Sequence, residues 1–295
     1  VGIGAWVSTG VRCKGEDAEG VIGGIDFLRK VVRNETIDLG KNVAIVGGGN
    51  TAMDACRTAV RLGADKVYNI YRRTKDKMPA DMLEIEEAEE EGVIFLNLTN
   101  PLEIISDENG HCRQMVLQVM ELGEPDASGR RAPIPVEGKT ETIDVDTVIL
   151  AIGQRVNAEG IEGAELTRKG GLVYDKDTFM TAIPGVFAGG DCVTGPATVI
   201  RAIAAGKVAA ANIDNYLGFN HKIESGVVVP EPRIENKTPC GRVTMMERNT
   251  TERKKDFNIV ENGMTCKEAN QEAHRCLRCD RFGYGVFKGG RVEEW

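Results

Sequence analysis

The stretch from Val43 to Arg73 constrains the fold more than any other part of this chain. It reads VAIVGGGNTAMDACRTAVRLGADKVYNIYRR: an apolar β-branched run, a glycine-rich turn, a helical pattern and a second apolar run that ends in arginines. Gly47, Gly49 and Ala52 satisfy G-x-G-x-x-A directly after the first run and directly before the helical pattern. This context distinguishes a dinucleotide-binding unit from a chance cluster of glycines, and it predicts an α/β domain of the Rossmann-like type.

The residues of this turn have separate roles in holding a pyrophosphate. The first glycine permits the tight turn, the second lets the backbone approach the phosphates, and the small third residue lets the helix lie close to the strand. The helix that begins near Asn50 and Thr51 directs unpaired N–H groups and its positive dipole end at the same point. We therefore expect a dinucleotide pyrophosphate at the turn Gly47, Gly48, Gly49, Asn50 and Thr51.

The end of the second strand predicts which dinucleotide binds. NAD-preferring units usually place Asp or Glu there, about 20 residues after the turn, to bind the ribose 2′-hydroxyl. Here Arg72 and Arg73 stand at that point, with Lys75 and Lys77 after them. Cations suit a 2′-phosphate, so the sequence indicates NADPH. The alternative is that the two arginines are merely the solvated end of an exposed strand.

Composition limits the organisation and the partners of the chain. A length of 295 residues predicts about two domains. The net charge of −8 argues against nucleic acid as a partner. No apolar run approaches the ~18 residues of a membrane span. Eight cysteines without a secretory signal indicate a reducing, cytoplasmic setting.

A second cofactor-binding feature follows at residues 183–192, IPGVFAGGDC, which predict a buried strand that ends at Gly190 and Asp191. A carboxylate at this point can accept hydrogen bonds from the hydroxyls of a ribityl chain. The Ala-rich helix that opens at Thr198 directs its positive end back toward that point, where it would stabilise a reduced flavin. Taken alone, the pattern fits a tight strand-to-helix turn of an ordinary α/β domain equally well.

The order of these motifs resembles that of a known family. GGGNTAMD, YRR with MPA, EEGV, AIGQ and GVFAGGD with its Ala-rich helix follow one another. That order is similar to the small subunit of NADPH-dependent glutamate synthase and its relatives, which are flavoproteins of the two-dinucleotide-binding-domain superfamily. VGIGAW and GEDAEGVIGGIDFLR look like the linker between the flavin and nicotinamide domains of that family. The resemblance covers about residues 1–217.

The resemblance implies a fold and a set of site residues. It implies a three-layer NADPH-binding domain at 37–150, inserted into a partial FAD-binding domain whose C-terminal half occupies 151–220. Residues 1–36 would be a linker with a residual strand of the FAD domain, and 221–295 an irregular tail with a Cys-rich motif. The residues assigned in this way are, for NADPH, Gly48, Gly49, Asn50, Thr51, Arg72 and Arg73; for the strand end where the two domains meet, Ala151, Ile152 and Gly153; and for FAD, Gly190, Asp191, Thr198 and Val199.

The sequence departs from the family at its start. The first flavin fingerprint of the family, an N-terminal G-x-G-x-x-G unit, and its cysteine-rich iron–sulfur module do not occur in these 295 residues. We therefore expect a fragment or one piece of a split enzyme, in which only half of the FAD site is present. The missing FAD and iron–sulfur region, in the same chain or a separate one, and a larger redox subunit would be its protein partners.

Two cysteines near the end of the chain carry a metal-binding pattern. Cys276 and Cys279 form C-x-x-C, whose spacing lets two thiolates reach one iron or zinc ion. The pattern also resembles the R-C-L-x-C start of an iron–sulfur motif of the family, so an iron–sulfur cluster is expected here. Cys240 and Cys266, or a partner chain, would complete it; zinc and an inert reduced pair are the alternatives. The other cysteines are single and are expected to be small buried side chains without a disulfide-reducing role: Cys13, Cys56, Cys112 and Cys192.

The function that follows from the resemblance is electron transfer. NADPH would pass hydride to FAD, and electrons would continue to iron–sulfur centres of a partner. This step depends on stacking and orientation, so no catalytic acid or base is assigned. The acidic run Glu84–Glu91 is expected to be a solvated helix face. Two alternatives remain: a ferredoxin:NADP oxidoreductase or pyrimidine-reducing relative, and a nucleotide-binding and docking module without turnover.

Overall fold

A five-stranded parallel sheet forms the centre of the computed structural model, which describes residues 1–125, 131–221 and 240–276. The strands lie in the order β2 (Val21–Gly23), β9 (Thr147–Leu150), β3 (Asn42–Val46), β4 (Lys66–Tyr71) and β5 (Ile94–Asn97). β3 and β4 are parallel neighbours joined by α2 (Asn50–Arg61), as the glycine pattern predicts. A parallel pair needs such a crossover, because a short hairpin can join only antiparallel strands.

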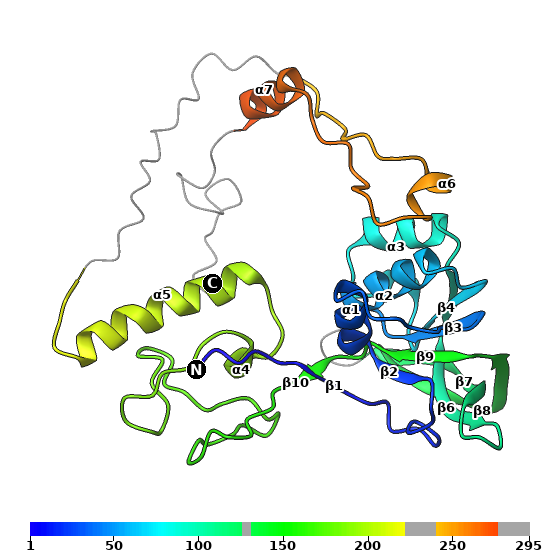
Figure 1. Cartoon of the computed structure of the whole chain (residues 1–295), viewed down its shortest axis with the longest axis horizontal. Helices are drawn as coiled ribbons and strands as arrows, with labels where there is room; N and C mark the ends of the chain where they lie inside the picture. Colours follow the sequence, from blue (N-terminus) through cyan, green and yellow to red (C-terminus); the bar gives the residue numbers. More distant parts are fainter. Residues whose placement is uncertain (126–130, 222–239, 277–295) are drawn as a thin grey trace.

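Both faces of this sheet are covered, so the domain has three layers (Figure 1). The helices α1 (Gly24–Val32), α2 and α3 (Met82–Glu90) cover one face. The antiparallel strands β6 (Thr99–Ser106), β7 (Cys112–Pro125) and β8 (Arg131–Asp144) cover the other. β3 shows why both faces are apolar: successive side chains of a strand point to opposite faces. Val43 and Ile45 pack with the helices, and Ala44 and Val46 pack with the antiparallel sheet.

The chain returns from the antiparallel sheet into the middle of the parallel one. β9 inserts between β2 and β3, so that Val148 is the register partner of both Val21 and Ala44. This return brings the carboxyl end of β9 beside the glycine turn that follows β3. In open α/β sheets ligands bind at such an edge, outside the carboxyl ends of the strands.

Two antiparallel segments, β1 (Val7–Ser8) and β10 (Gln154–Arg155), connect this domain to the second part of the chain. That part contains α4 (Asp191–Thr194) and α5 (Val199–Tyr216). The prediction of a buried strand at 183–192 is wrong, since only an isolated bridge between Met180 and Phe187 forms there. A strand requires a neighbour that supplies a ladder of hydrogen bonds, and the described residues supply none along this run.

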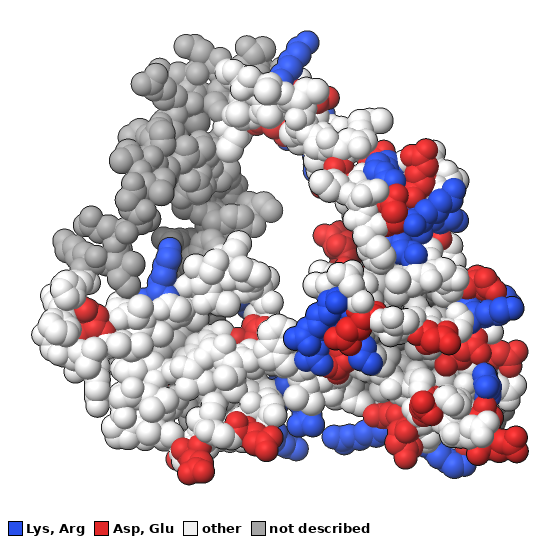
Figure 2. All heavy atoms as spheres, viewed as in Figure 1, with Lys and Arg blue, Asp and Glu red and all other residues white. Residues whose placement is uncertain are grey.

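Residues 1–5 form no strand either. This segment makes single backbone contacts with the 187–189 run, such as the Gly189 N–H to the Val1 carbonyl at 3.2 Å, and no ladder. α5 is also weakly packed, because none of its side chains is buried. Figure 2 shows that few charged side chains lie around α5, whereas both signs of charge are dense over the three-layer domain.

The last described segment contains α6 (Thr250–Arg253) and α7 (Cys266–Arg275). α6 lies beside α3 of the three-layer domain, and α7 lies farther out (Figure 1). Among the described helices, none has the length and apolar character needed to cross a membrane.

Candidate functional site: a dinucleotide cleft at the glycine turn

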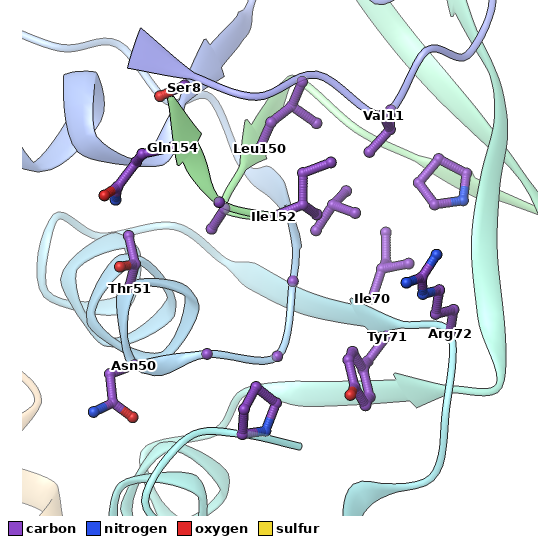
Figure 3. A pocket seen from close by; sticks show the side chains of 18 of the residues that line it. Ser8, Val11, Asn50, Thr51, Ile70, Tyr71, Arg72, Leu150, Ile152 and Gln154 are labelled. Carbon is purple, nitrogen blue, oxygen red and sulfur yellow. The ribbon is translucent and has the colours of Figure 1, made fainter. Parts of the chain in front are cut away.

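A cleft of about 700 Å³ opens at the carboxyl ends of β3, β4 and β9 (Figure 3). Its walls include the glycine turn with the start of α2, the end of β4, the start of β6 and the segment that follows β9. A volume of this size lies within the range of about 300–1,000 Å³ that is typical of ligand sites. The predicted site residues that line it are Gly47, Gly48, Gly49, Asn50, Thr51, Arg72, Ala151, Ile152 and Gly153.

Gly47 is required by the fold of the turn itself. Its φ of +146° is a backbone conformation that other residues rarely adopt. A Cβ atom on Gly47 would lie 2.3 Å from the Ala151 carbonyl oxygen, so β9 could not approach. The Gly47 N–H donates to the Ile70 carbonyl at 3.0 Å, and its carbonyl accepts the Asn69 side-chain amide at 2.9 Å. The turn is therefore tied to β4 and β9.

At position 49, no contact within the described residues requires a glycine. A Cβ atom there would meet nothing within 4 Å, and its backbone is ordinary and extended, with φ −94°. Gly49 is the N-cap of α2 and has no side chain to cap the first N–H groups of the helix. An open backbone at a helix N-terminus is the arrangement that admits an anion.

The side chains beside the turn are held in place. Asn50 accepts the Asp81 N–H at 3.0 Å, which links the start of α2 to the start of α3. The Tyr71 hydroxyl donates to the Lys77 carbonyl at 2.8 Å, and the ring of Tyr71 packs against Gly48. Figure 3 shows Asn50 and Thr51 on one side of the glycine turn and Tyr71 across from them.

The cations after β4 divide into two groups. Lys75 pairs with Glu89 at 2.5 Å, and Lys77 pairs with Asp76 at 2.9 Å, so each lysine already has a carboxylate partner. Arg72 is exposed on the cleft wall, and Arg73 is half-buried outside the cleft lining. Within the described residues neither arginine forms an ion pair, and the buried Nε of Arg73 has no hydrogen-bond partner.

The opposite end of the cleft belongs to the connection between the two parts of the chain. Gly153 and Gln154 line it, and the Gly153 carbonyl accepts the Thr9 N–H at 3.0 Å. Ser8 lies across from Gln154 in the β1–β10 pair (Figure 3). Pro196, which precedes α5, also lines the cleft. The cleft therefore ends against the second part of the chain.

A smaller cavity of about 350 Å³ lies in that second part. Gly190 and Asp191 line it, and Ala202, Gly206 and Ala209 of α5 leave the space open. The Asp191 carboxylate accepts the Ala197 N–H at 3.1 Å, which orients it. The other two predicted flavin residues lie outside the cavity lining: Thr198 is the N-cap of α5 and Val199 begins the helix, 75% exposed.

One residue of the cleft architecture has no signal in the sequence. Asn69 lies in the middle of β4, fully buried, and its amide reaches both the Gly47 carbonyl and the Cys56 sulfur, the latter at 3.7 Å. Its Oδ1 has no partner in the described chain. Burial raises the pKa of the Cys56 thiol, which therefore stays protonated. An asparagine inside an apolar strand reads as an irregularity, and only the structure shows that it holds the turn.

The described cysteines form no disulfide, and the described residues contain no group of three or more His, Cys, Asp or Glu side chains that could hold a metal ion. Cys276 immediately follows α7 and is exposed. Cys279 lies outside the described residues. The predicted metal site at this pair stays a prediction.

Comparison with known proteins identifies the family. A family model described as pyridine nucleotide-disulphide oxidoreductase matches residues 1–206. The chain is 41% identical to the NADP(+)-dependent formate dehydrogenase subunit beta of Moorella thermoacetica, over 95% of the chain and 41% of that protein. It is 38% identical to the glutamate synthase [NADPH] small chain of Escherichia coli strain K12, over 74% of the chain and 50% of that protein.

The chain thus spans about half or less of the length of these relatives. Mycobacterium tuberculosis FprA in complex with NADPH has the same fold, with a TM-score of 0.60 and 19% identity over 74% of the chain and 63% of FprA. The expected resemblance to glutamate synthase small chains and the expected two-dinucleotide-binding fold are confirmed. The chain belongs to the pyridine nucleotide-disulphide oxidoreductase family of NAD(P)H-dependent enzymes.

Proposed function

We propose that this chain is the NADPH-binding part of a flavoprotein oxidoreductase, and that the cleft at the glycine turn holds the NADPH. One observation carries the proposal: Gly49 leaves an open backbone at the N-terminus of α2, inside a cleft that has an exposed arginine on its wall. The pyrophosphate would lie at Gly48–Thr51, where the first N–H groups of α2 donate to it. We also propose the domain limits expected from the sequence: an NADPH-binding domain at 37–150 and the C-terminal half of an FAD-binding domain at 151–220.

The 2′-phosphate of NADPH would lie at Arg72 and Arg73. Lys75 and Lys77 already pair with carboxylates, whereas the two arginines form no ion pair among the described residues, so we assign the 2′-phosphate to the arginines. A guanidinium binds phosphate through two parallel N–H donors, which gives geometric selectivity as well as charge. The unpartnered Nε of Arg73 fits a bound anion, because a buried donor without a partner is costly.

The second cavity fits one part of a flavin cofactor. Asp191 supplies an oriented carboxylate for sugar hydroxyls, and the small residues of α5 leave room beside it. When both cofactors are bound, NADPH supplies a hydride and FAD accepts it. The residues Ala151, Gly153 and Pro196 would position the nicotinamide end of the cleft and exclude water there. We propose that protein outside these 295 residues supplies the adenosine half of the FAD site.

The electrons would then pass to iron–sulfur centres of a partner subunit. The names of the relatives support a partner subunit, since one is a formate dehydrogenase subunit and the other a glutamate synthase small chain. We also propose an iron–sulfur cluster at Cys276 and Cys279, and a location in the reducing cytoplasm. The terminal acceptor would decide between a glutamate synthase, a formate dehydrogenase and a ferredoxin-linked enzyme.

The test is an assay of the purified chain alone and together with the protein proposed to supply the rest of the FAD site, either joined to its N-terminus or added as a separate chain. We expect NADPH to bind to this chain alone, and NADPH-dependent reduction of a dye with added FAD to rise strongly when that protein is present. Assays of flavin, iron and sulfide on both forms locate the cofactors. If the combined form binds NADPH but shows neither flavin absorbance nor dye reduction, the chain is a nucleotide-binding module and the proposed oxidoreductase function is wrong.

A further inference from the structure

The C-terminal end of α3 buries a carboxylate that the sequence presents as part of a solvated acidic face. Glu87 is 8% exposed and Glu91 is 2% exposed, so the expectation of a solvated run is wrong for these two residues. Two arginines of α2 surround Glu91: Arg57 Nη2 lies 2.8 Å from Oε1, and Arg61 Nη1 lies 2.6 Å from Oε2. Arg57 also pairs with Glu87 at 2.5 Å.

A third arginine reaches the same carboxylate from the far end of the chain. Arg253 of α6, with a side chain 3% exposed, places Nε 3.2 Å from Glu91 Oε1. Its two Nη atoms lie 2.7 Å from Glu90 and 2.5 Å from Glu247. Arg61 Nε adds a hydrogen bond to the Asp256 carbonyl at 3.1 Å. Figure 2 shows acidic and basic side chains interleaved where α6 meets α3.

These contacts differ from ordinary surface ion pairs. An exposed pair contributes little, because water competes with it, but a buried charge needs partners to offset its desolvation. Burial by itself would raise the pKa of Glu91, yet hydrogen bonds from Arg61 and Arg57 and their charges outweigh burial and lower it. Glu91 is therefore ionised at neutral pH, and the guanidinium of Arg253 is one of its three partners.

The segment that presents Arg253 is a closed hairpin. Residues 246–248 run antiparallel to 260–262, with the Arg248 N–H bonded to the Val260 carbonyl at 2.8 Å and the Asn262 N–H to the Met246 carbonyl at 2.8 Å. α6 forms its tip, where Asn249 caps the helix. Arg248 closes the tip with a two-bond pair to Asp256, at 2.7 and 2.9 Å.

The base of the same hairpin carries α7. Residues 240–243 run along this helix: the Gln271 amide donates to the Gly241 carbonyl at 2.8 Å, and the Val243 N–H donates to Glu272 at 2.6 Å. Thr265 and Glu268 form a capping box at its start. α7 buries none of its own residues, so the hairpin and not a hydrophobic core holds it.

We propose that residues 240–276 act as a strut: Arg253 anchors the segment at Glu90 and Glu91, and the hairpin connects the cysteine-bearing helix α7, which lies farther out, to the three-layer domain. The occupant of this docking site is a segment of the same chain. Although the strut follows the second part of the chain in sequence, its ion pairs attach it to the three-layer domain. The cysteines at both ends of α7 then keep a fixed position relative to the dinucleotide cleft.

Hydrogen–deuterium exchange of the whole chain tests this proposal, with Arg253→Ala as the variant and Arg248→Ala as its control. Both remove an arginine ion pair from the same hairpin, but only Arg253 contacts α3. We expect Arg253→Ala to speed exchange about tenfold or more in peptides covering 246–262 and at the ends of α2 and α3. Arg248→Ala should change only the hairpin tip, by less.

The proposal is overturned if Arg253→Ala leaves the exchange of 246–262 as in the unmodified chain, or if Arg248→Ala exposes the ends of α2 and α3 equally. Should Arg253→Ala also unprotect the core strands β3 and β4, Glu90→Gln decides the matter. That change weakens the ion pair between α3 and Arg253 at an exposed position, outside the hairpin. Faster exchange confined to 246–262 then supports the strut, and unchanged exchange refutes it.

Discussion

Replacing two glycines of the same turn by alanine separates what the fold requires from what the ligand requires. A Cβ atom on Gly47 would meet the Ala151 carbonyl oxygen at 2.3 Å, at a φ of +146°. A strained backbone costs about 1–3 kcal/mol and overpacking costs about as much again, so Gly47→Ala should destabilise the domain by about 2–6 kcal/mol. This is a large part of the roughly 5–15 kcal/mol that stabilises a typical domain.

The expectation for Gly49→Ala is the reverse. Its Cβ atom would meet nothing within 4 Å, and its φ of −94° suits alanine. A poorer N-cap and a less flexible unfolded chain offset each other, so stability should change by no more than about 1 kcal/mol. The added methyl group occupies the space where a pyrophosphate would approach. Losing one charge-assisted hydrogen bond costs about 1.5–3 kcal/mol, which weakens NADPH binding about 10- to 100-fold.

Two measurements on each variant check this reasoning. Urea denaturation gives the free energy of unfolding, and the quenching or enhancement of NADPH fluorescence gives the dissociation constant. The refuting results are specific: an unchanged unfolding midpoint for Gly47→Ala, or an NADPH affinity within twofold of the original for a folded Gly49→Ala. The second result would mean that the cofactor does not lie against this backbone.

Three further predictions follow from the same region. The double change Arg72→Ala and Arg73→Ala should weaken NADPH binding much more than NADH binding, as measured by titration, and an equal loss for both would exclude the 2′-phosphate from this position. Asn69→Asp should destabilise the domain by about 2–4 kcal/mol at pH 8 and much less at pH 5. Burial raises the pKa of the new carboxyl group, and only its neutral form can donate a hydrogen bond to the turn. Urea midpoints that do not fall as pH rises would contradict this. Burial also raises the pKa of Cys56, so iodoacetamide at pH 8 should modify exposed Cys266 and leave Cys56 intact by mass spectrometry, whereas modification of Cys56 in the folded chain would show that the buried pair with Asn69 opens.

The cleft is predictable from sequence because its determinants are local. Gly47, Gly49 and Ala52 lie within six residues, and the strand and helix on either side set their geometry. The return of the chain at β9 is also predictable, since residues 145–153 form an apolar run that ends in small residues. The strand order is less so: nothing in that run states that it inserts between β2 and β3.

Local sequence patterns do not predict the contacts between segments that lie far apart in the chain. Glu91 closes an acidic run that resembles a solvated helix face, but it is buried, and one of its three arginine partners is Arg253, which lies 162 positions later. The buried strand expected at 183–192 does not form, for a related reason. Its residues are apolar, as in a buried strand, but among the described residues no neighbouring strand forms a ladder of hydrogen bonds with it. Residue type predicts the tendency of a segment, whereas the partner decides the outcome.

α2 connects the cleft, whose determinants are local, with the ion pairs between distant segments. Its N-terminus faces the cleft and offers N–H groups to an anion, while its C-terminal half carries Arg57 and Arg61 at i and i+4, on one face, both bonded to Glu91. Cations are favourable at that end of a helix, because the dipole is negative there. The arginines therefore complement the helix and fix its far end to α3 and to the strut. Since α2 is a rigid unit of three turns, the network that fixes its far end also limits how far the glycine turn at its near end can move.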